Sequence, residues 1–259
     1  MKERIDILLV ERRLVESRTK AQWLIRNGYV MVNGVVIKKP GKRIDNALTI
    51  ELKHEYPFVG RGGLKLQAAL EGFKIDVTEK ICADIGASIG GFTDCMLKYG
   101  AAKVYAIDTA TELLHPSLLC KDHVVKLLGT DARELDNLDE DVDILTIDIT
   151  FASLRDILPK TKNFLKRDGD IIALVKPLFE TEFYGEKKFN VIKDSKRLYE
   201  ILCNLVEWSE NNKIFPINII KSPLLGKGGS IEFLLQYKLE EKHRNLHLKR
   251  KIKKILKLD

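Results

Sequence analysis

The chain has 259 residues, of which 45% are hydrophobic and 31% are charged, so it can form one large domain and a small one. It contains no run of eighteen apolar residues, and its N-terminal stretch is interrupted by charges. We therefore expect neither a membrane span nor a signal peptide. The four cysteines lack C-x-x-C spacing, which predicts reduced thiols, no metal site and a cytoplasmic protein.

The net charge of +7 is distributed unevenly along the chain. Residues 1–55 carry +5 and residues 238–259 carry +6, whereas the centre carries −4. Basic ends on an acidic centre predict contact with a polyanion. The alternative, strongest for the tail, is that these charges only form a solvated surface.

Residues 1–55 predict a small α+β domain. An apolar stripe from Ile5 to Leu14 indicates a first helix. Ser17 can cap a second helix, which Gly28 would end. Strands at 30–32 and 35–37 flank Asn33-Gly34, a pair typical of tight hairpin turns. A basic loop follows at 38–43.

The pattern S-R-x-x-A-x-x-L-I-x-x-G-x-V-x-V-N-G, from Ser17 to Gly34, resembles the S4-type RNA-binding domain. The resemblance implies that the second helix and the following loop face RNA phosphates. Contacts of this kind position RNA without reading its sequence. The alternative is a small basic domain that docks only protein. The implied RNA-binding residues are Arg18, Lys20, Lys38, Lys39, Lys42 and Arg43.

Residues 56–59 are expected to be a linker and residues 60–238 a second domain. Strands are predicted at 81–85, 103–107, 124–128, 143–148, 171–175, 214–220 and 231–237, and helices at 63–72, 91–99, 153–165 and 194–210. This alternation predicts a doubly wound α/β sheet, whose last two strands form an antiparallel hairpin at its edge. Residues 239–259 predict a basic helix or tail with an apolar side formed by Leu248, Ile252, Ile255 and Leu256.

The stretch CADIGASIGGFTD, residues 82–94, predicts a strand, a glycine turn and a helix that hold a nucleotide-type cofactor. Ser88 stands where a dinucleotide fingerprint requires glycine, and no Walker lysine follows. S-adenosylmethionine is therefore favoured, and NAD remains the alternative. The loop residues expected to hold the cofactor are Gly86, Ala87, Ser88, Gly90, Gly91 and Phe92.

Three acids at strand ends are expected to contact the same cofactor. Asp84 would meet the methionine ammonium group, Asp108 the ribose hydroxyls, and Asp131 the adenine. For Asp108 the alternative is an ordinary solvated strand end.

Four further fragments accompany this loop: GRGGLKL (60–66), DILTIDITFASL (143–154), ALVKPLFE (173–180) and GGSIEFLL (228–235). Together with the N-terminal segment they resemble the TlyA family. The resemblance implies a Rossmann-like, FtsJ-like domain that uses S-adenosylmethionine to methylate the ribose 2′-oxygen of cytidine in ribosomal RNA. The implied partners are ribosomal RNA and ribosomal subunits, and neither membrane nor DNA is expected.

By the same resemblance, the catalytic set is Lys65, Asp148, Lys176 and Glu232, and Asp148 is also expected to bind the cofactor beside its sulfonium. A ribose hydroxyl needs a nearby base or a cation that stabilises the forming alkoxide, and two lysines oriented by two carboxylates can supply both. Taken singly, each of these residues could be a surface charge or a member of a structural ion pair.

The GRGG segment and the fourth strand add two expectations. Arg61 would contact phosphate, and its flanking glycines would admit the RNA backbone. Asp148 is not followed by the Pro-Pro pair of exocyclic-amine methyltransferases, which favours oxygen as the acceptor.

The sequence also departs from the family pattern, with TATELL after Asp108 and Ile89 inside the loop. The departures put the adenosine contacts and the choice of target in question. Two other functions stay open: a non-enzymatic RNA-binding or ribosome-assembly factor, and a membrane-active haemolysin.

Overall fold

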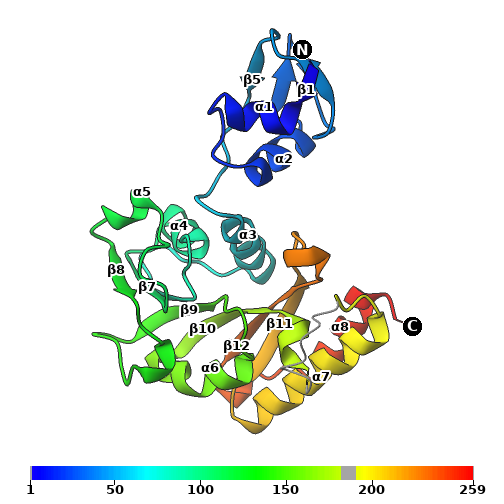
Figure 1. Ribbon diagram of the computed structural model, residues 1–259. Coiled ribbons are helices and arrows are strands. Elements are labelled where there is room, and N and C mark those ends of the chain that lie inside the picture. Colours follow the sequence, from blue (N-terminus) through cyan, green and yellow to red (C-terminus); the bar gives the residue numbers. More distant parts are fainter. Residues whose placement is uncertain (1, 182–190, 259) are drawn as a thin grey trace. The chain divides into compact units, whose positions relative to one another are not determined.

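The computed structural model describes residues 2–181 and 191–258, and the chain divides into two compact units between Pro57 and Phe58 (Figure 1). Each unit has its own hydrophobic core. No helix in the described ranges is both long and apolar enough to cross a membrane.

The first unit contains the predicted helices and hairpin, as α1 (Ile5–Glu11), α2 (Arg18–Arg26), β2 (Val30–Val32) and β3 (Val35–Val36). Ser17 Oγ accepts the Lys20 N–H at 3.4 Å, which confirms the cap. Asn33 and Gly34 have φ of 47° and 77°, as the predicted turn requires. The extension of the first helix to Leu14 was wrong: α1 ends at Glu11, and Leu14 is exposed.

Three short strands of this unit were not predicted: β1 (Lys2–Arg4), β4 (Arg43–Asp45) and β5 (Ile50–Leu52). β1 pairs with β4, and β5 joins the free edge of β2, both antiparallel. Strands of three residues are too short to show an alternating pattern. Their apolar members, such as Ile44 and Ile50, nevertheless pack into the same core as the two helices.

The second unit is built on a seven-stranded sheet in the order β11-β12-β10-β9-β6-β7-β8. The strands are β6 (Ile81–Ile85), β7 (Lys103–Asp108), β8 (Val124–Leu128), β9 (Val142–Ile147), β10 (Leu165–Val175), β11 (Phe215–Lys221) and β12 (Phe233–Lys238). All neighbours are parallel except β12, which is antiparallel to β10 and β11. The predicted α/β fold with a terminal antiparallel hairpin is confirmed.

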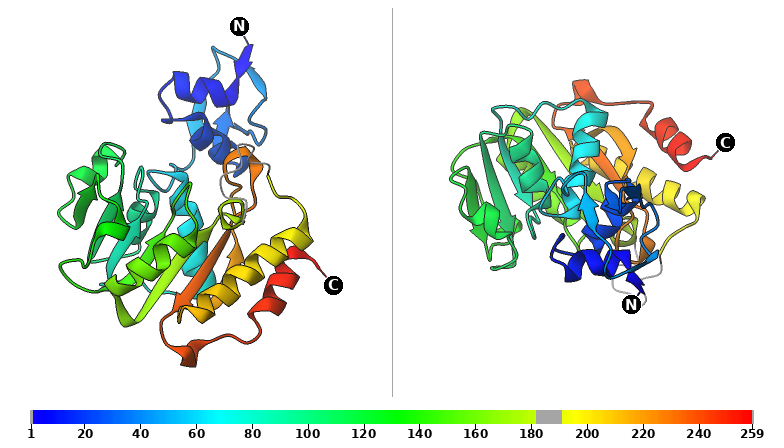
Figure 2. Two further views of the ribbon diagram at one scale, coloured as in Figure 1. Left: turned by 60° about the horizontal axis from the view of Figure 1, so that its bottom comes forward. Right: turned by 90° about the horizontal axis from the view of Figure 1, so that it is seen from above.

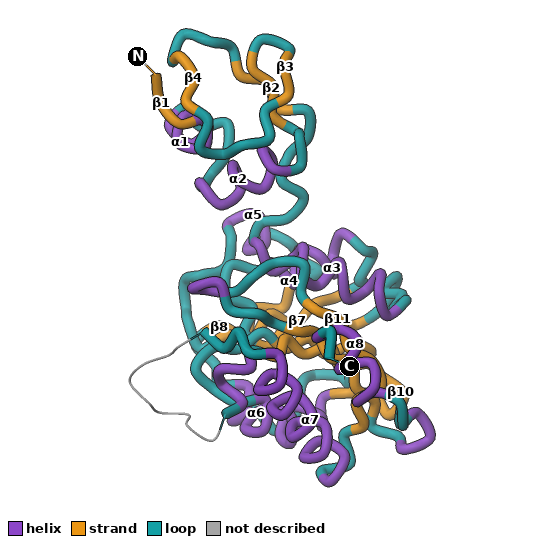
Figure 3. Tube along the Cα trace, turned by 90° about the vertical axis from the view of Figure 1, so that its right-hand side faces the viewer, coloured by secondary structure: helices purple, strands orange, loops and turns teal. Residues whose placement is uncertain are grey.

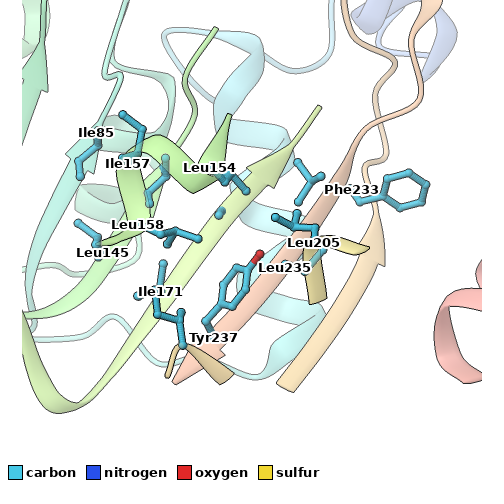
Figure 4. Packing of buried hydrophobic residues seen from close by; sticks show 14 of the residues in the cluster. Ile85, Leu145, Leu154, Ile157, Leu158, Ile171, Leu205, Phe233, Leu235 and Tyr237 are labelled. Atoms are coloured by element: carbon cyan, nitrogen blue, oxygen red, sulfur yellow. The ribbon is translucent and has the colours of Figure 1, made fainter. Parts of the chain in front are cut away.

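Helices cover both faces of this sheet (Figure 3). α3 (Arg61–Phe73) and α4 (Gly91–Lys98) pack on one face, and α6 (Leu154–Thr161), α7 (Ser195–Asn211) and α8 (Leu248–Leu256) pack on the other. Figure 4 shows Leu154 and Leu158 of α6 against Leu145 and Ile171 of the sheet. A further short helix, α5 (Pro116–Leu119), was not predicted.

Two segments differ from their sequence-based description. The helix predicted at 153–165 ends at Thr161, because Lys162–Phe164 form a 3₁₀ turn and Leu165 begins an eleven-residue strand. Phe58 and Val59, placed in the expected linker, are buried, and the Val59 N–H donates to Asp94 Oδ2 at 2.8 Å. Both residues therefore belong to the core of the second unit.

Candidate active site

Lys65 and Glu232 form a buried ion pair. Lys65 Nζ lies 2.6 Å from Glu232 Oε2, and the side chains are 10% and 5% exposed. Lys65 projects from the first turns of α3, and Glu232 directly precedes β12. An unpaired charge at either position would be costly, so each residue stabilises the other.

Lys176 and Asp148 form the second pair, with Nζ 2.6 Å from Oδ1. Lys176 Nζ also donates to the Ile149 carbonyl at 2.6 Å and to Thr150 Oγ1 at 2.9 Å. An ammonium group has three donors, and all three are used here. Lys176 is thus held in one position at the end of β10.

The strand register brings the two pairs to one edge of the sheet. Val175 lies opposite Phe233 in the antiparallel ladder of β10 and β12, so Lys176 and Glu232 leave neighbouring strands at adjacent positions. Asp148 follows β9, the other neighbour of β10. Adjacent strands are about 4.8 Å apart, so Asp148, Lys176 and Glu232 lie at one edge of the sheet, and Lys65 reaches that edge through its ion pair with Glu232.

The glycine loop after β6 reaches the same edge. Gly86 has φ 81°, and a Cβ there would lie 2.4 Å from the Asp148 carbonyl oxygen. Gly90 also has positive φ, and a Cβ there would overlap Leu118. Ser88, at the position where a dinucleotide loop has glycine, adopts φ 50°. The turn from Gly86 to Gly90 therefore has the tight backbone of a glycine-rich loop, although Ser88 carries a side chain at one of its positive-φ positions.

Asp84 is not on the surface of this site. It is fully buried, and its carboxylate accepts the Thr93 N–H at 2.9 Å, the Thr93 hydroxyl at 2.7 Å and the Thr146 hydroxyl at 3.0 Å. Burial raises the pKa of Asp84 to about 6. This placement does not match the direct contact with a cofactor ammonium group that the sequence suggested. Asp84 instead fixes the start of α4 to β6, because Thr93 lies in the first turn of that helix.

Asp108 ends β7 and faces the glycine loop. Its Oδ2 accepts the Ser88 N–H at 2.7 Å, and its Oδ1 accepts the Ala110 N–H at 2.8 Å. A carboxylate has about four acceptor positions, so each oxygen of this half-exposed group retains capacity for a further donor.

Asp131 follows β8 and caps the 3₁₀ turn Ala132–Glu134. Its carboxylate also accepts from the Arg133 guanidinium, which holds the pKa of Asp131 below its usual value. Any contact of Asp131 with an adenine would have to share the carboxylate with Arg133.

The glycines of the GRGG segment serve packing within the chain. A Cβ on Gly63 would lie 2.3 Å from the Phe58 ring, and a Cβ on Gly91 would lie 3.0 Å from the Gly63 nitrogen. The space expected for an RNA backbone is therefore occupied by the contact between α3 and α4. The Arg61 guanidinium donates to the Leu225 carbonyl at 2.6 Å and remains exposed.

Two residues near the site were not singled out by the sequence. Gly226 lies against Glu232, since a Cβ there would be 2.0 Å from Oε1. Phe151, three residues after Asp148, is 65% exposed with φ 67°, and its ring centroid lies 5.7 Å from that of Phe179. An exposed aromatic side chain in a left-handed conformation is unusual, but neither property can be read from a sequence.

The basic residues predicted to face RNA in the first unit divide into two groups. Arg18 donates to buried Asp6 at 3.2 Å, and Lys20 pairs with Glu16 at 2.6 Å. The remaining four are exposed and, among the residues described in this unit, form no ion pair: Lys38, Lys39, Lys42 and Arg43.

Comparison with known proteins agrees with both units. The profile of the FtsJ-like methyltransferases matches residues 58–239, and that of the S4 domain matches residues 3–47. The chain is 36% identical over 236 residues to the 16S/23S rRNA (cytidine-2'-O)-methyltransferase TlyA of Mycobacterium tuberculosis, covering 90% of this chain and 88% of that protein. It is 35% identical to Hemolysin A of Brachyspira hyodysenteriae, covering 90% of this chain and 99% of that protein.

A solved structure covers nearly the whole chain. A protein of Streptococcus thermophilus that carries a hemolysin name is 33% identical, with a TM-score of 0.74, and the match covers 99% of this chain and 94% of that one. The predicted resemblance is confirmed: the chain belongs to the TlyA family, in which an S4 domain precedes an FtsJ-like methyltransferase domain.

Proposed function

We propose that this chain transfers a methyl group from S-adenosylmethionine to the ribose 2′-oxygen of cytidine in ribosomal RNA, in the cytoplasm. The observation that carries the proposal is the meeting of two lysine–carboxylate pairs beside a glycine loop at one sheet edge. Ligands of open α/β sheets bind at the carboxyl ends of the strands. The names of the M. tuberculosis and Campylobacter jejuni relatives, both rRNA (cytidine-2'-O)-methyltransferases, support the substrate class.

The residues present fit the cofactor. S-Adenosylmethionine, when bound, supplies a methyl group on a positively charged sulfur. Asp108 keeps acceptor capacity for ribose hydroxyls, and the turn from Gly86 to Gly91 leaves its backbone close to the sheet edge. Asp148 adds negative charge at the same edge, which favours a cationic ligand. Asp131 would hold the adenine only alongside Arg133.

Lys176 is proposed to accept the proton of the 2′-hydroxyl. A neutral amine has two N–H donors, so it can keep two of its three present acceptors. Asp148 and the Ile149 carbonyl are the nearer two at 2.6 Å, whereas Thr150 lies on the exposed side at 2.9 Å. The lone pair would then face the exposed side, from which RNA must approach.

Lys65 and Phe151 are proposed to assist at this edge. Lys65 is held by Glu232 and brings positive charge to where the alkoxide develops, as preorganised groups do in other enzymes. Phe151 offers an exposed ring on which the target base can stack. The S4 domain, with its loop Lys38–Arg43, would bind RNA phosphates outside the site.

The test is Lys176→Met, assayed by mapping 2′-O-methyl groups in purified ribosomal RNA and by calorimetric titration with S-adenosylmethionine. Loss of methylation with unchanged cofactor affinity is expected, because Lys176 is assigned to the RNA hydroxyl. Lys160→Met, an exposed lysine on α6, is the matched control. Full methylation by Lys176→Met would refute the assignment, and wild-type protein that does not bind the cofactor would favour a non-enzymatic RNA-binding factor.

A further inference from the structure

Five exposed lysines lie at the start of α7 and the end of α8. They are Lys193, Lys196, Lys253, Lys254 and Lys257, here called the α7–α8 patch. Among residues 191–258 none of the five forms an ion pair. Toward the other end of the helix pair, Lys249 pairs with Glu207 at 2.5 Å and Arg244 with Glu210 at 2.7 Å, whereas Lys213 and Arg250 are exposed and form no ion pair among residues 191–258. Exposed lysines without an ion pair are therefore more numerous at the end formed by the start of α7 and the end of α8.

The two helices pack antiparallel, side by side (Figure 2). Lys249 of α8 forms an ion pair with Glu207 of α7, and Lys253 Nζ lies 5.8 Å from the centroid of the Tyr199 ring. Residues further along α8 therefore contact residues earlier in α7, so the two helices run in opposite directions. One further turn of α8 brings Lys257 level with the start of α7. The helix ends that carry the five lysines therefore lie side by side.

This surface lies toward the active edge of the sheet. β11 is parallel to β10, because each is antiparallel to β12. α7 ends four residues before β11 begins, so the chain turns back directly from the helix into the strand. The seventeen residues of α7 span about 25 Å, which is close to the length of the seven-residue strand β11. Its first turn therefore returns to the level where Lys176 leaves β10, and the N-terminal end of its dipole adds positive potential there.

α8 is a fixed part of this unit and not a loose tail. Leu248, Ile252 and Leu256 are buried in the core shared with α7 and the sheet. Its opposite side is basic and exposed. The helix follows the segment that matches the FtsJ-like profile, which ends at residue 239.

We propose that the α7–α8 patch binds phosphates of the ribosomal RNA strand that flanks the target nucleotide. The inference rests on the proposed function for the nature of the RNA. Lysines on a rigid support bind phosphates as point charges and orient RNA without reading its sequence. The methyltransferase unit thereby holds its substrate by its own surface, in addition to the S4 domain.

The experiment compares full-length K253E/K254E/K257E with K80E/K160E/K213E. The control changes the net charge equally at three exposed lysines that lie beside the opposite strand ends. Binding of deproteinised 16S and 23S ribosomal RNA is measured by filter binding between about 50 and 200 mM KCl. The patch variant is expected to bind RNA at least about 10-fold more weakly than the control variant. The slope of the logarithm of its affinity against the logarithm of the salt concentration should become smaller by about one for each phosphate contact that is lost.

Calorimetry with S-adenosylmethionine checks that each variant is folded, and K253Q/K254Q/K257Q replaces the patch variant if charge reversal prevents folding. RNA affinity equal to the wild type, or an equal loss in the control, would overturn the proposal. RNA binding is read without methyl transfer, so the two proposals fail separately. A wild-type protein that binds RNA through the patch but methylates nothing refutes only the proposed function.

Discussion

A single methyl group at Gly226 is expected to displace the Glu232 carboxylate within its buried pair with Lys65. The Cβ of alanine would lie 2.0 Å from Glu232 Oε1 and 2.4 Å from Ser230 Oγ, and both atoms are ends of side chains that can move. Gly226 has φ −71°, which any residue adopts without strain. The cost to stability should therefore stay near the low end of overpacking, about 1 kcal/mol. The carboxylate must shift by 1 Å or more, and displacements of about that size cost about 100-fold in rate.

The assay is single-turnover methylation of ribosomal RNA by Gly226→Ala at saturating cofactor, with urea unfolding in parallel. Gly229→Ala is the matched control in the same turn. It has φ 86° and nothing within 4 Å of its Cβ, so it should lose about 1 kcal/mol through backbone strain while the rate is kept. Wild-type rates for Gly226→Ala, or equal rate losses in both variants, would refute the reasoning that the position of Glu232 controls transfer.

Three further predictions concern the same unit. Glu232→Gln leaves the Lys65 ammonium buried without a countercharge, so the free energy of unfolding should fall by about 3 kcal/mol; adding Lys65→Met should restore part of it in a double-mutant cycle, and additive losses would contradict the pairing. Asp108→Asn should weaken S-adenosylmethionine binding about 10-fold in calorimetry while leaving RNA affinity intact, because one acceptor oxygen becomes a donor; unchanged cofactor affinity would exclude its ribose role. The pKa of Asp84 is raised by burial from 3.8 to about 6, so the folded state binds the proton more tightly than the unfolded state. Stability should fall by ~3 kcal/mol as the pH rises from about 3 to above 7, relative to non-titrating Asp84→Asn, and a pH-independent difference in urea unfolding would contradict this.

Elements with a strong local pattern could be predicted from the sequence. The apolar strands and the long helix at 195–211 follow from hydrophobic periodicity, and the Asn33-Gly34 turn follows from its need for positive φ. The short strands around Ile44 and Ile50 could not be predicted, because partners distant in sequence make them strands. Leu165 was assigned to the preceding helix for the same reason, since only pairing with Val142 shows it to be strand.

The candidate site was predictable as a set of residues but not as pairs. Motifs indicated the two lysines and the two acids, whereas the partner of each lysine depends on strand order. Asp84 is a residue for which the sequence suggested a role that its position in the structure does not match. Its place at the end of a strand suggested a ligand contact, but Thr93 and Thr146 occupy its carboxylate in the interior. Burial of this kind depends on packing, which a strand-end pattern does not encode.

The position of β12 has a consequence for the order of folding. It follows both β10 and β11 in the sequence, yet it lies between them in the sheet. In the native sheet β10 and β11 are not paired with each other, so the position between them is filled only when β12 inserts. Glu232 enters with that insertion, and the charge cluster is incomplete in every shorter nascent chain. The predicted catalytic set can therefore be complete only after the ribosome has made the chain through β12.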